Sequence, residues 1–265
     1  MTIASLPEPA DPSHGRDGSA LPAAAHGRVS VVIPALNEAA NLPHVFARLP
    51  HGLHEVILVD GGSIDDTVAV ARSLRPGIRI VTQTRRGKGN ALACGFEACR
   101  GDIIVMIDAD GSTDPAEIPA FVQPLLDGAD FVKGSRFMRG GGSADITPFR
   151  RAGNWMLSQS VNTLYGTRYT DLCYGYNAFW RDCLPVMAVD CDGFEVETLI
   201  NIRIARAGLS IAEVPSFESE RIFGESNLNT VRDGCRVMST IVRERFRRAR
   251  APHVERIAIA AEPSS

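Results

Sequence analysis

The sequence has no apolar run approaching the roughly 20 residues that span a bilayer, and its first residues lack a signal-peptide core. It also lacks an excess of positive charge, because 28 Lys and Arg stand against 31 Asp and Glu, for a formal net charge of -3. A protein that follows nucleic-acid phosphates needs a strongly basic surface. We therefore expect a cytoplasmic protein whose partners do not include nucleic acid.

Paired cysteine motifs are missing as well. The six cysteines are scattered, with no CxxC pair and no zinc-ligand spacing. This pattern indicates reduced, mostly buried thiols rather than a disulfide framework or a structural zinc site.

The chain divides by composition. Residues 1–27 are rich in Pro, Ala, Ser, Asp and Gly without periodicity, so we expect a disordered tail, and we expect a second flexible tail over 251–265. From Arg28, β-branched runs alternate with segments of helical period in four strand–helix repeats. Such repeats predict an α/β fold over 28–230, with a mostly parallel central sheet and helices on both faces.

Ligands of such sheets bind beyond the carboxyl ends of the strands. The predicted strand ends carry a polar, glycine-rich and acidic rim made of residues 34–38, 60–63, 83–88 and 108–112. We expect the functional site on this rim.

Two rim segments resemble nucleotide-binding loops. "DGGSIDDT" places Asp60 before a sharp turn, where its carboxylate either contacts a nucleotide or only belongs to a turn in which Ser63 or Asp65 caps the next helix. "TRRGKGN" contains a GxG, but Leu92 stands where the dinucleotide fingerprint needs a third glycine, and the P-loop pattern also fails. A basic loop entering a helix remains, either as a phosphate site or as a solvated turn.

Asp108 and Asp110 follow the apolar run "IIVMI" and lie two residues apart. If the strand extends through them, their side chains point the same way and repel unless a cation or a shared proton intervenes. Hard oxygen ligands suit Mg²⁺ or Mn²⁺, so the pair predicts a metal site. The alternative is a pair of aspartates that caps the following turn.

Several motifs occur together and in a fixed order, namely "VVIPALNE", "VILVDGGSIDDT", "GKGNALACGFEACRGDIIVMIDADGST" and "FVKGSRF". Together they resemble the inverting family-2 glycosyltransferases, in particular the dolichol-phosphate mannosyltransferase-like branch. The resemblance covers about 29–240. It implies a Rossmann-like, A-type glycosyltransferase fold and metal-dependent transfer of a hexose from a UDP- or GDP-sugar. One departure is Gly61, where many relatives have a second acid. This departure leaves open whether the base of the donor nucleotide is uracil or guanine.

The resemblance also implies roles for the donor side. It assigns Asp110 as a direct metal ligand, and Asp108 to the ribose and metal. The residues implied to bind the nucleotide-sugar are Pro34, Asn37, Glu38, Asp60, Lys88, Asp108, Arg221 and Ser226. Arg221 and Ser226 belong to an Arg-x-x-Gly-x-Ser loop that closes over the diphosphate.

On the acceptor side, the resemblance implies Arg136 of "GSRF" and Tyr176 of "DLCYGYNAFWR". A phosphate acceptor needs no general base, whereas an alcohol needs one, for which Glu195, Glu197 and Asp171 are the candidates. Glu195 or Glu197 can equally be a surface acid at a helix start. Two other hypotheses stay open: a haloacid-dehalogenase-type phosphatase with Asp108 as nucleophile, and a nucleotide-sugar-binding subunit without activity.

Residues 231–250 predict an amphipathic basic helix, since seven arginines stand against Asp233 and Glu244. Val231, Met238, Ile241, Val242 and Phe246 fall near one helical face. Such a helix either lies on an anionic membrane or packs its apolar stripe on the domain. The first case suits a polyprenyl phosphate acceptor at the inner membrane face, and the second suits a soluble acceptor.

Overall fold

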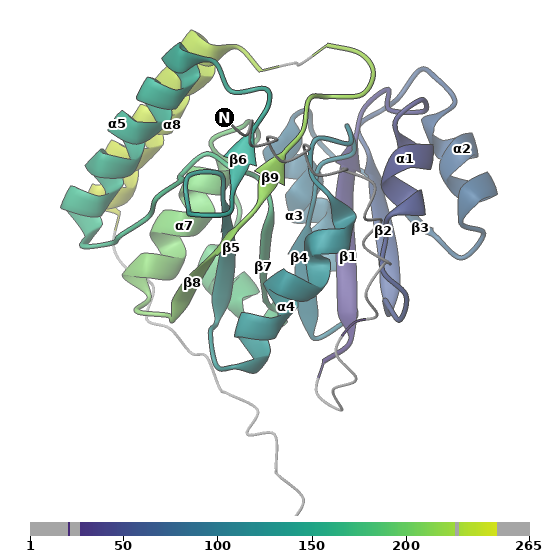
Figure 1. Cartoon of the computed structure of the whole chain (residues 1–265), viewed down its shortest axis with the longest axis horizontal. Helices are drawn as coiled ribbons and strands as arrows, with labels where there is room; N and C mark the ends of the chain where they lie inside the picture. Colours follow the sequence, from purple (N-terminus) through teal and green to yellow (C-terminus); the bar gives the residue numbers. More distant parts are fainter. Residues whose placement is uncertain (1–20, 22–26, 226–227, 248–265) are drawn as a thin grey trace, which may run out of the picture.

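The computed structural model describes residues 21, 27–225 and 228–247. The expected flexible segments, 1–27 and 251–265, lie outside the described residues apart from Leu21 and Gly27. Within the described part, the predicted sequence of alternating strands and helices is confirmed, and the helices flank a central sheet (Figure 1).

The central sheet has seven strands in the order β3-β2-β1-β4-β7-β5-β8. Its strands are β1 (Val29–Ala35), β2 (Glu55–Asp60), β3 (Arg79–Thr82), β4 (Ile103–Met106), β5 (Phe131–Ser135), β7 (Asn177–Trp180) and β8 (Ile211–Pro215). Only β7 runs antiparallel to its neighbours, β4 and β5, so the sheet is mostly parallel as predicted. Two short strands, β6 (Gly142–Ser143) and β9 (Phe217–Glu218), pair separately.

Helices cover both faces of this sheet. One face carries α1 (Leu42–Ala47), α2 (Thr67–Leu74) and α4 (Ile118–Leu126), and the other carries α3 (Lys88–Ala98), α6 (Leu184–Met187) and α7 (Val196–Arg206). The alternation of side chains along β1 and β4 divides the core, since Val31 and Val105 pack on the first face, and Val32 and Ile104 on the second. Because both faces are buried, the strands read as continuous apolar runs.

The two longest helices, α5 (Pro148–Tyr165) and α8 (Thr230–Phe246), lie side by side at one end of the sheet (Figure 1). They pack against α7 through a third apolar cluster that includes Leu157, Ile202 and Ile241. An ion pair of 2.9 Å between buried Arg203 and Glu244 joins α7 to α8. The helix predicted over 231–250 is therefore part of the folded domain as far as the structure describes it.

The predicted apolar face of α8 is divided by this packing. Ile241 is buried and Met238 packs against the cluster, whereas Val231, Val242 and Phe246 are exposed. The five residues do not form one buried stripe, because Val237 and Ile241 define the buried side of α8 while Val231, Val242 and Phe246 are exposed. No helix in the described part of the chain is both long enough and apolar enough to cross a bilayer.

The cysteines and two segments outside the regular alternation complete the fold. All six cysteines are free, although Cys173 and Cys235 are exposed rather than buried. The glycine-rich segment 134–151 contains the end of β5, all of β6 and the start of α5. Residues 171–176 form the irregular approach to β7. This irregular segment brings Gly175 to the cavity at the carboxyl ends of the strands.

Candidate active site

A continuous cavity of about 920 Å³ lies over the carboxyl ends of β1 to β4 and extends between α5 and α8. Its first half is lined by the polar rim predicted from the sequence, including Pro34, Gly61, Gln83 and Asp108. Its second half is lined by side chains of α5 and α8, such as Phe149 and Met238. The cavity thus joins a polar, charged region to a largely apolar one.

Asp108 and Asp110 both line this cavity, but they do not extend from a strand as expected. β4 ends at Met106, so the alternation of strand side chains does not orient the two carboxylates. Asp110 Oδ1 accepts hydrogen bonds of 3.0 and 2.7 Å from the backbone N–H and hydroxyl of Ser112. Gly111 has φ +77°, a backbone conformation that side chains disfavour, and a Cβ there would lie 2.5 Å from Cδ1 of Ile222. The turn, rather than the strand, places the pair.

Each of these two carboxylates is paired with a different cation. Lys88 Nζ lies 2.6 Å from Asp108 Oδ1 and 2.8 Å from Glu197 Oε1. Burial alone would lower the pKa of Lys88, but the two carboxylates outweigh burial and hold that pKa above its usual value. Gly175 allows this cluster to form, since a Cβ there would lie 3.0 Å from Nζ of Lys88.

The GxG of the basic loop has a packing role. A Cβ at Gly87 would collide with the carbonyl of Asp192, and one at Gly89 would lie 2.5 Å from the carbonyl of Cys191. The Gly89 N–H donates to the Asp192 carbonyl at 2.9 Å, so this amide at the start of α3 is not open to a phosphate. Arg85 also pairs with Asp192, at 2.8 Å. Of the basic residues in this loop, Lys88 alone lines the cavity.

Arg221 is the cation of the second carboxylate. Its guanidinium lies 3.0 Å from Asp110 Oδ2 and 2.9 Å from Glu38 Oε1. The pKa of Arg221 is raised because Glu38 and Asp110 outweigh its partial burial. The backbone N–H of Ile222 donates to the Asp110 carbonyl at 3.3 Å, which holds this segment against the carboxylate turn.

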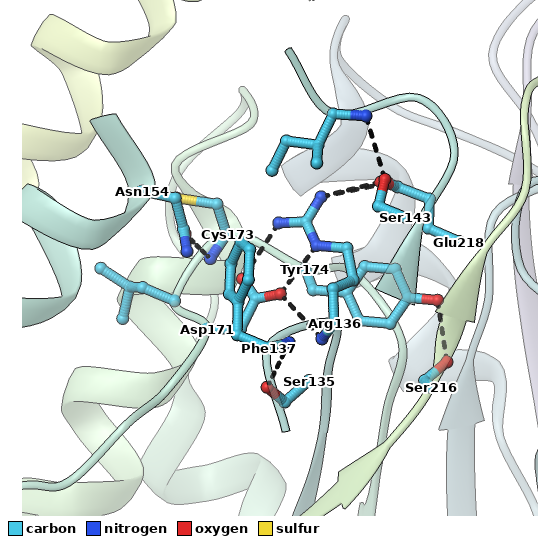
Figure 2. Close-up of polar contacts among 12 residues, drawn as sticks. Ser135, Arg136, Phe137, Ser143, Asn154, Asp171, Cys173, Tyr174, Ser216 and Glu218 are labelled. Carbon is cyan, nitrogen blue, oxygen red and sulfur yellow. Dashed lines mark hydrogen bonds and ion pairs between the residues drawn. The ribbon is translucent and has the colours of Figure 1, made fainter. Parts of the chain in front are cut away.

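Arg136 lies deeper, in a buried ion cluster (Figure 2). Its Nε and Nη2 donate to Asp171 at 2.7 and 3.0 Å, and Nη1 donates to Glu218 at 3.0 Å. The guanidinium also lies 5.0 Å from the centroid of the Tyr174 ring. Two carboxylates thus neutralise Arg136, which also lines the cavity, and the contact of its guanidinium with an acceptor phosphate stays a prediction.

Two predicted residues are corrected by their burial. Asp171 is fully buried behind Arg136 and does not line the cavity, so it cannot reach an acceptor hydroxyl as a general base. Tyr176 is also fully buried, stacks on Phe121 with ring centroids 3.9 Å apart, and donates its hydroxyl to the Asp114 carbonyl. Both side chains support the walls of the site rather than its surface.

The structure separates the other predicted residues into those that line the cavity and those that do not. The lining contains Pro34, Glu38, Lys88, Asp108, Asp110, Arg136, Glu197 and Arg221. It does not contain Asn37, Asp60 or Glu195. Asp60 accepts from the N–H groups of Gly62 and Ser63, and Asn37 accepts from that of Ile64, so both shape the turn after β2. Ser226 lies outside the described residues.

Sequence reasoning missed the wall formed by α5 and α8. Asn154 of α5 is the most informative member, because it is buried, lines the cavity and accepts from the Cys173 N–H through Oδ1. Its Nδ2 has no hydrogen-bond partner. A buried amide with a free donor suits a ligand oxygen. The sequence of α5 gives no sign of which side of this helix faces the cavity.

The donor set fits a divalent cation shared with a ligand. No group of three His, Cys, Asp or Glu side chains within the described ranges could hold a metal by itself. Asp108 and Asp110 provide hard carboxylate oxygens at the cavity wall, and Mg²⁺ is commonly bound by one or two carboxylates together with substrate phosphates. The site therefore matches a metal that binds together with a diphosphate.

The comparisons with known proteins agree with this geometry. The model of glycosyl transferase family 2 matches residues 30–184. The chain is 31% identical over 227 residues to glycosyltransferase AglJ of Haloferax volcanii, covering 84% of this chain and 72% of the relative. It is 33% identical over 243 residues to polyprenol monophosphomannose synthase of Mycolicibacterium smegmatis, covering 84% and 90%.

A solved structure gives the same result. Glucosyl-3-phosphoglycerate synthase of Mycobacterium tuberculosis, in complex with Mn²⁺, UDP and glucosyl-3-phosphoglycerate, superposes with a TM-score of 0.64 at 27% identity. The likeness covers 82% of this chain and 79% of that one. These matches contradict the phosphatase hypothesis and the hypothesis of a binding subunit without activity. The chain belongs to glycosyl transferase family 2, has the A-type glycosyltransferase fold, and is a glycosyltransferase.

Proposed function

We propose that this enzyme transfers a hexose from a UDP- or GDP-sugar to a polyprenyl phosphate, with inversion and with Mg²⁺ or Mn²⁺ bound. The observation that carries the proposal is the continuity of the cavity. Its polar end holds Asp108 and Asp110, and its other end is walled by apolar side chains of α5 and α8. A nucleotide-sugar fits the first end, and the start of an isoprenoid chain fits the second.

At the donor end, Asp108 and Asp110 would hold the cation, which neutralises the diphosphate as it leaves. Pro34 and Glu38 line the part of the cavity beside them. Lys88 and Arg221 are the two cations nearest the carboxylate pair, at 2.6 and 3.0 Å. Both side chains would stabilise negative charge that develops on the leaving group. Such fixed cations favour the transition state over the bound donor.

At the acceptor end, the side chains of the lining suit a polyprenyl phosphate, which carries a phosphate on a long apolar chain. The apolar side chains from α5, α8 and the loop before α5 are Ile146, Phe149, Met156, Leu157, Val231, Val237 and Met238. The free Nδ2 of Asn154 and the guanidinium of Arg150 are two polar donors in the same lining. Arg150 is held 2.8 Å from Asp145, and a phosphate would compete with that exposed pair at small cost. The Mycolicibacterium relative is named for a polyprenol acceptor.

A second candidate function is transfer of the sugar to a water-soluble hydroxyl. Glu197 is a nearly buried carboxylate in the cavity wall, 2.8 Å from Lys88, and it is the one predicted base that lines the cavity. The structural neighbour from Mycobacterium tuberculosis was crystallised with glucosyl-3-phosphoglycerate. A hydroxyl acceptor would require a base such as Glu197, whereas a phosphate acceptor would not.

The two functions are separated by one set of assays. UDP, GDP, CDP and dTDP, each with and without Mn²⁺, are first compared by thermal shift to identify the donor nucleotide. The matching sugar nucleotide is then supplied with either a short polyprenyl phosphate or 3-phosphoglycerate. We expect transfer to the lipid phosphate, and Glu197→Gln should keep a pH profile parallel to that of the wild type. Transfer to the soluble acceptor alone, with loss of the basic limb in Glu197→Gln, would establish the second function instead.

The same proposal includes peripheral contact with the cytoplasmic face of a membrane. Phe149, Met156 and Val231 line the cavity and are exposed, by 69%, 52% and 67%, so the cavity opens through an apolar surface. Val242 and Phe246, further along α8, are exposed as well, and so are Arg243 and Arg245 of the same helix. Apolar and basic side chains on one helix favour an anionic bilayer surface.

A further inference from the structure

Asn41 connects two segments that are far apart in sequence. Its Nδ2 donates to the Phe223 carbonyl at 3.1 Å, and its Oδ1 accepts from the Phe223 N–H at 2.9 Å. The amide side chain thus pairs with both backbone groups of one residue, 182 positions later in the chain. Asn41 is 2% exposed, so these bonds are shielded from water.

The Asn41 side chain has no role in capping the helix that follows it. Asn41 is the N-cap of α1, yet its side chain makes no capping hydrogen bond. Besides Phe223, its Nδ2 contacts Glu38 Oε2 at 2.5 Å. The side-chain hydrogen bonds of Asn41 therefore go to the segment that carries Arg221 and to Glu38, which forms an ion pair with Arg221.

The bonds of Asn41 hold the segment of Arg221, and the Arg221 guanidinium neutralises the Asp110 carboxylate. Arg221 Nη2 is 3.0 Å from Asp110 Oδ2, and Lys88 already neutralises Asp108. A divalent cation bound to Asp110 would lie within a few ångströms of the guanidinium, and like charges at such a distance repel strongly. Arg221 and the cation thus compete for one carboxylate. A diphosphate that arrives with the cation offers Arg221 a new anionic partner.

We infer that Asn41 is a positioning residue that holds Arg221 against Asp110, and that a divalent cation exchanges with Arg221 at this carboxylate when the donor binds. The inference rests on the proposed function, because it assumes a metal-bound diphosphate in this cavity. It assigns Arg221 two successive partners, Asp110 in the free enzyme and the diphosphate in the complex.

The test measures Mn²⁺ affinity of the nucleotide-free protein by electron paramagnetic resonance, a readout independent of turnover. Arg221→Ala should bind Mn²⁺ about tenfold more tightly than the wild type, since a nearby unit charge is removed. Asn41→Ala should shift the affinity in the same direction, because Arg221 is no longer held. The double variant should match Arg221→Ala, since both changes act through one contact. Asn41→Ser, which keeps a good helix N-cap, replaces Asn41→Ala if that variant does not fold.

Arg150→Ala is the matched control. It removes the same charge from the same cavity, but Arg150 pairs with Asp145 and not with the carboxylate pair. Its Mn²⁺ affinity should change much less than that of Arg221→Ala. Equal shifts in the two variants would overturn the exchange, because they would indicate only a general effect of charge. An unchanged affinity in Asn41→Ala or Asn41→Ser, with a tighter Arg221→Ala, would overturn the role of Asn41.

The effect of Asn41 on donor binding is measured through the KM for the sugar nucleotide. Asn41→Ala should raise the KM for the sugar nucleotide several-fold while Mn²⁺ alone binds more tightly, a combination that simple loosening of the fold does not produce. A KM unchanged from the wild type would contradict the positioning role. Failure of the wild type to bind any nucleoside diphosphate with Mn²⁺ would instead contradict the proposed function itself, so the two failures are distinguishable.

Discussion

Lys88 Nζ lies 2.6 Å from Oδ1 of Asp108, within a cluster where the same ammonium also contacts Glu197. The side chains of Lys88 and Glu197 are 13% and 5% exposed, so this cluster is largely removed from water. The lysine is what allows two carboxylates to stand close together before any cation binds.

Removing this ammonium should destabilise the fold. Lys88→Met leaves the nearly buried Glu197 carboxylate without a counterion, and we expect a loss of about 3 kcal/mol in the free energy of unfolding. Urea denaturation at pH 7 measures the loss. Lys88→Met combined with Glu197→Gln should recover part of it, because the unpaired charge is removed. Equal stability of the single and double variants would show that Lys88 does not serve as this counterion.

The metal assignment depends on Asp110. Asp110→Ala should abolish transfer and metal-dependent nucleotide binding, and Asp108→Ala should be nearly as damaging. The fold should survive with a loss of about 1 to 2 kcal/mol, since the main bonds removed are those from Ser112 and Arg221. Calorimetric titration of UDP and GDP with and without Mn²⁺ checks the prediction. Asp145→Ala, which removes another carboxylate of the cavity, is the control and should retain the metal dependence.

The attachment of α8 to α7 should depend on pH. Burial of Glu244 opposes its ionisation, but hydrogen bonds and charge from Arg203 and Arg247 outweigh burial and hold its pKa below the usual range. A lowered folded-state pKa gives stability that is present above the unfolded-state value of about 4.3 and is lost as the pH falls through the folded value.

Glu244→Gln should therefore cost about 3 kcal/mol at pH 7, and the difference from the wild type should shrink as the pH falls below about 4. Urea denaturation at both pH values measures it. Arg247→Ala, which removes a more exposed partner, should cost less than about 1 kcal/mol. A difference between wild type and Glu244→Gln that stays constant with pH would contradict the ion-pair explanation.

Membrane contact should depend on exposed side chains of α8. The double substitution Val242→Asp and Phe246→Asp should abolish salt-sensitive binding to anionic liposomes, because it replaces exposed apolar side chains with negative charges. Val242 and Phe246 are 48% and 83% exposed, so the substitutions should leave the core intact. Truncation after Asn229 is a poorer test, because it would also remove Val237 and Ile241 from the core. Leu74→Asp on α2 is the control and should bind normally. If the wild-type protein does not bind anionic liposomes at low salt, the membrane contact is ruled out.

Much of the fold follows from the sequence alone. The apolar runs at 29–35 and 103–106 predict buried strands, and the helical periods between them predict a mostly parallel sheet, because these preferences act between near neighbours along the chain. The order of the polar rim residues follows as well, since parallel strands end at one edge. The four motifs in their fixed order, of which the one around Asp108 and Asp110 is a part, indicate the family.

Only the tertiary structure decided which of these residues face the cavity. Asp171 is a chemically reasonable base in the sequence, yet it is buried as the partner of Arg136. Asn41 and Phe223 give no sign of each other in the sequence, and they meet because the segment after β9 crosses the start of α1. A side chain's partners come from segments that packing brings together from distant parts of the chain, and local propensity and spacing carry no information about that approach.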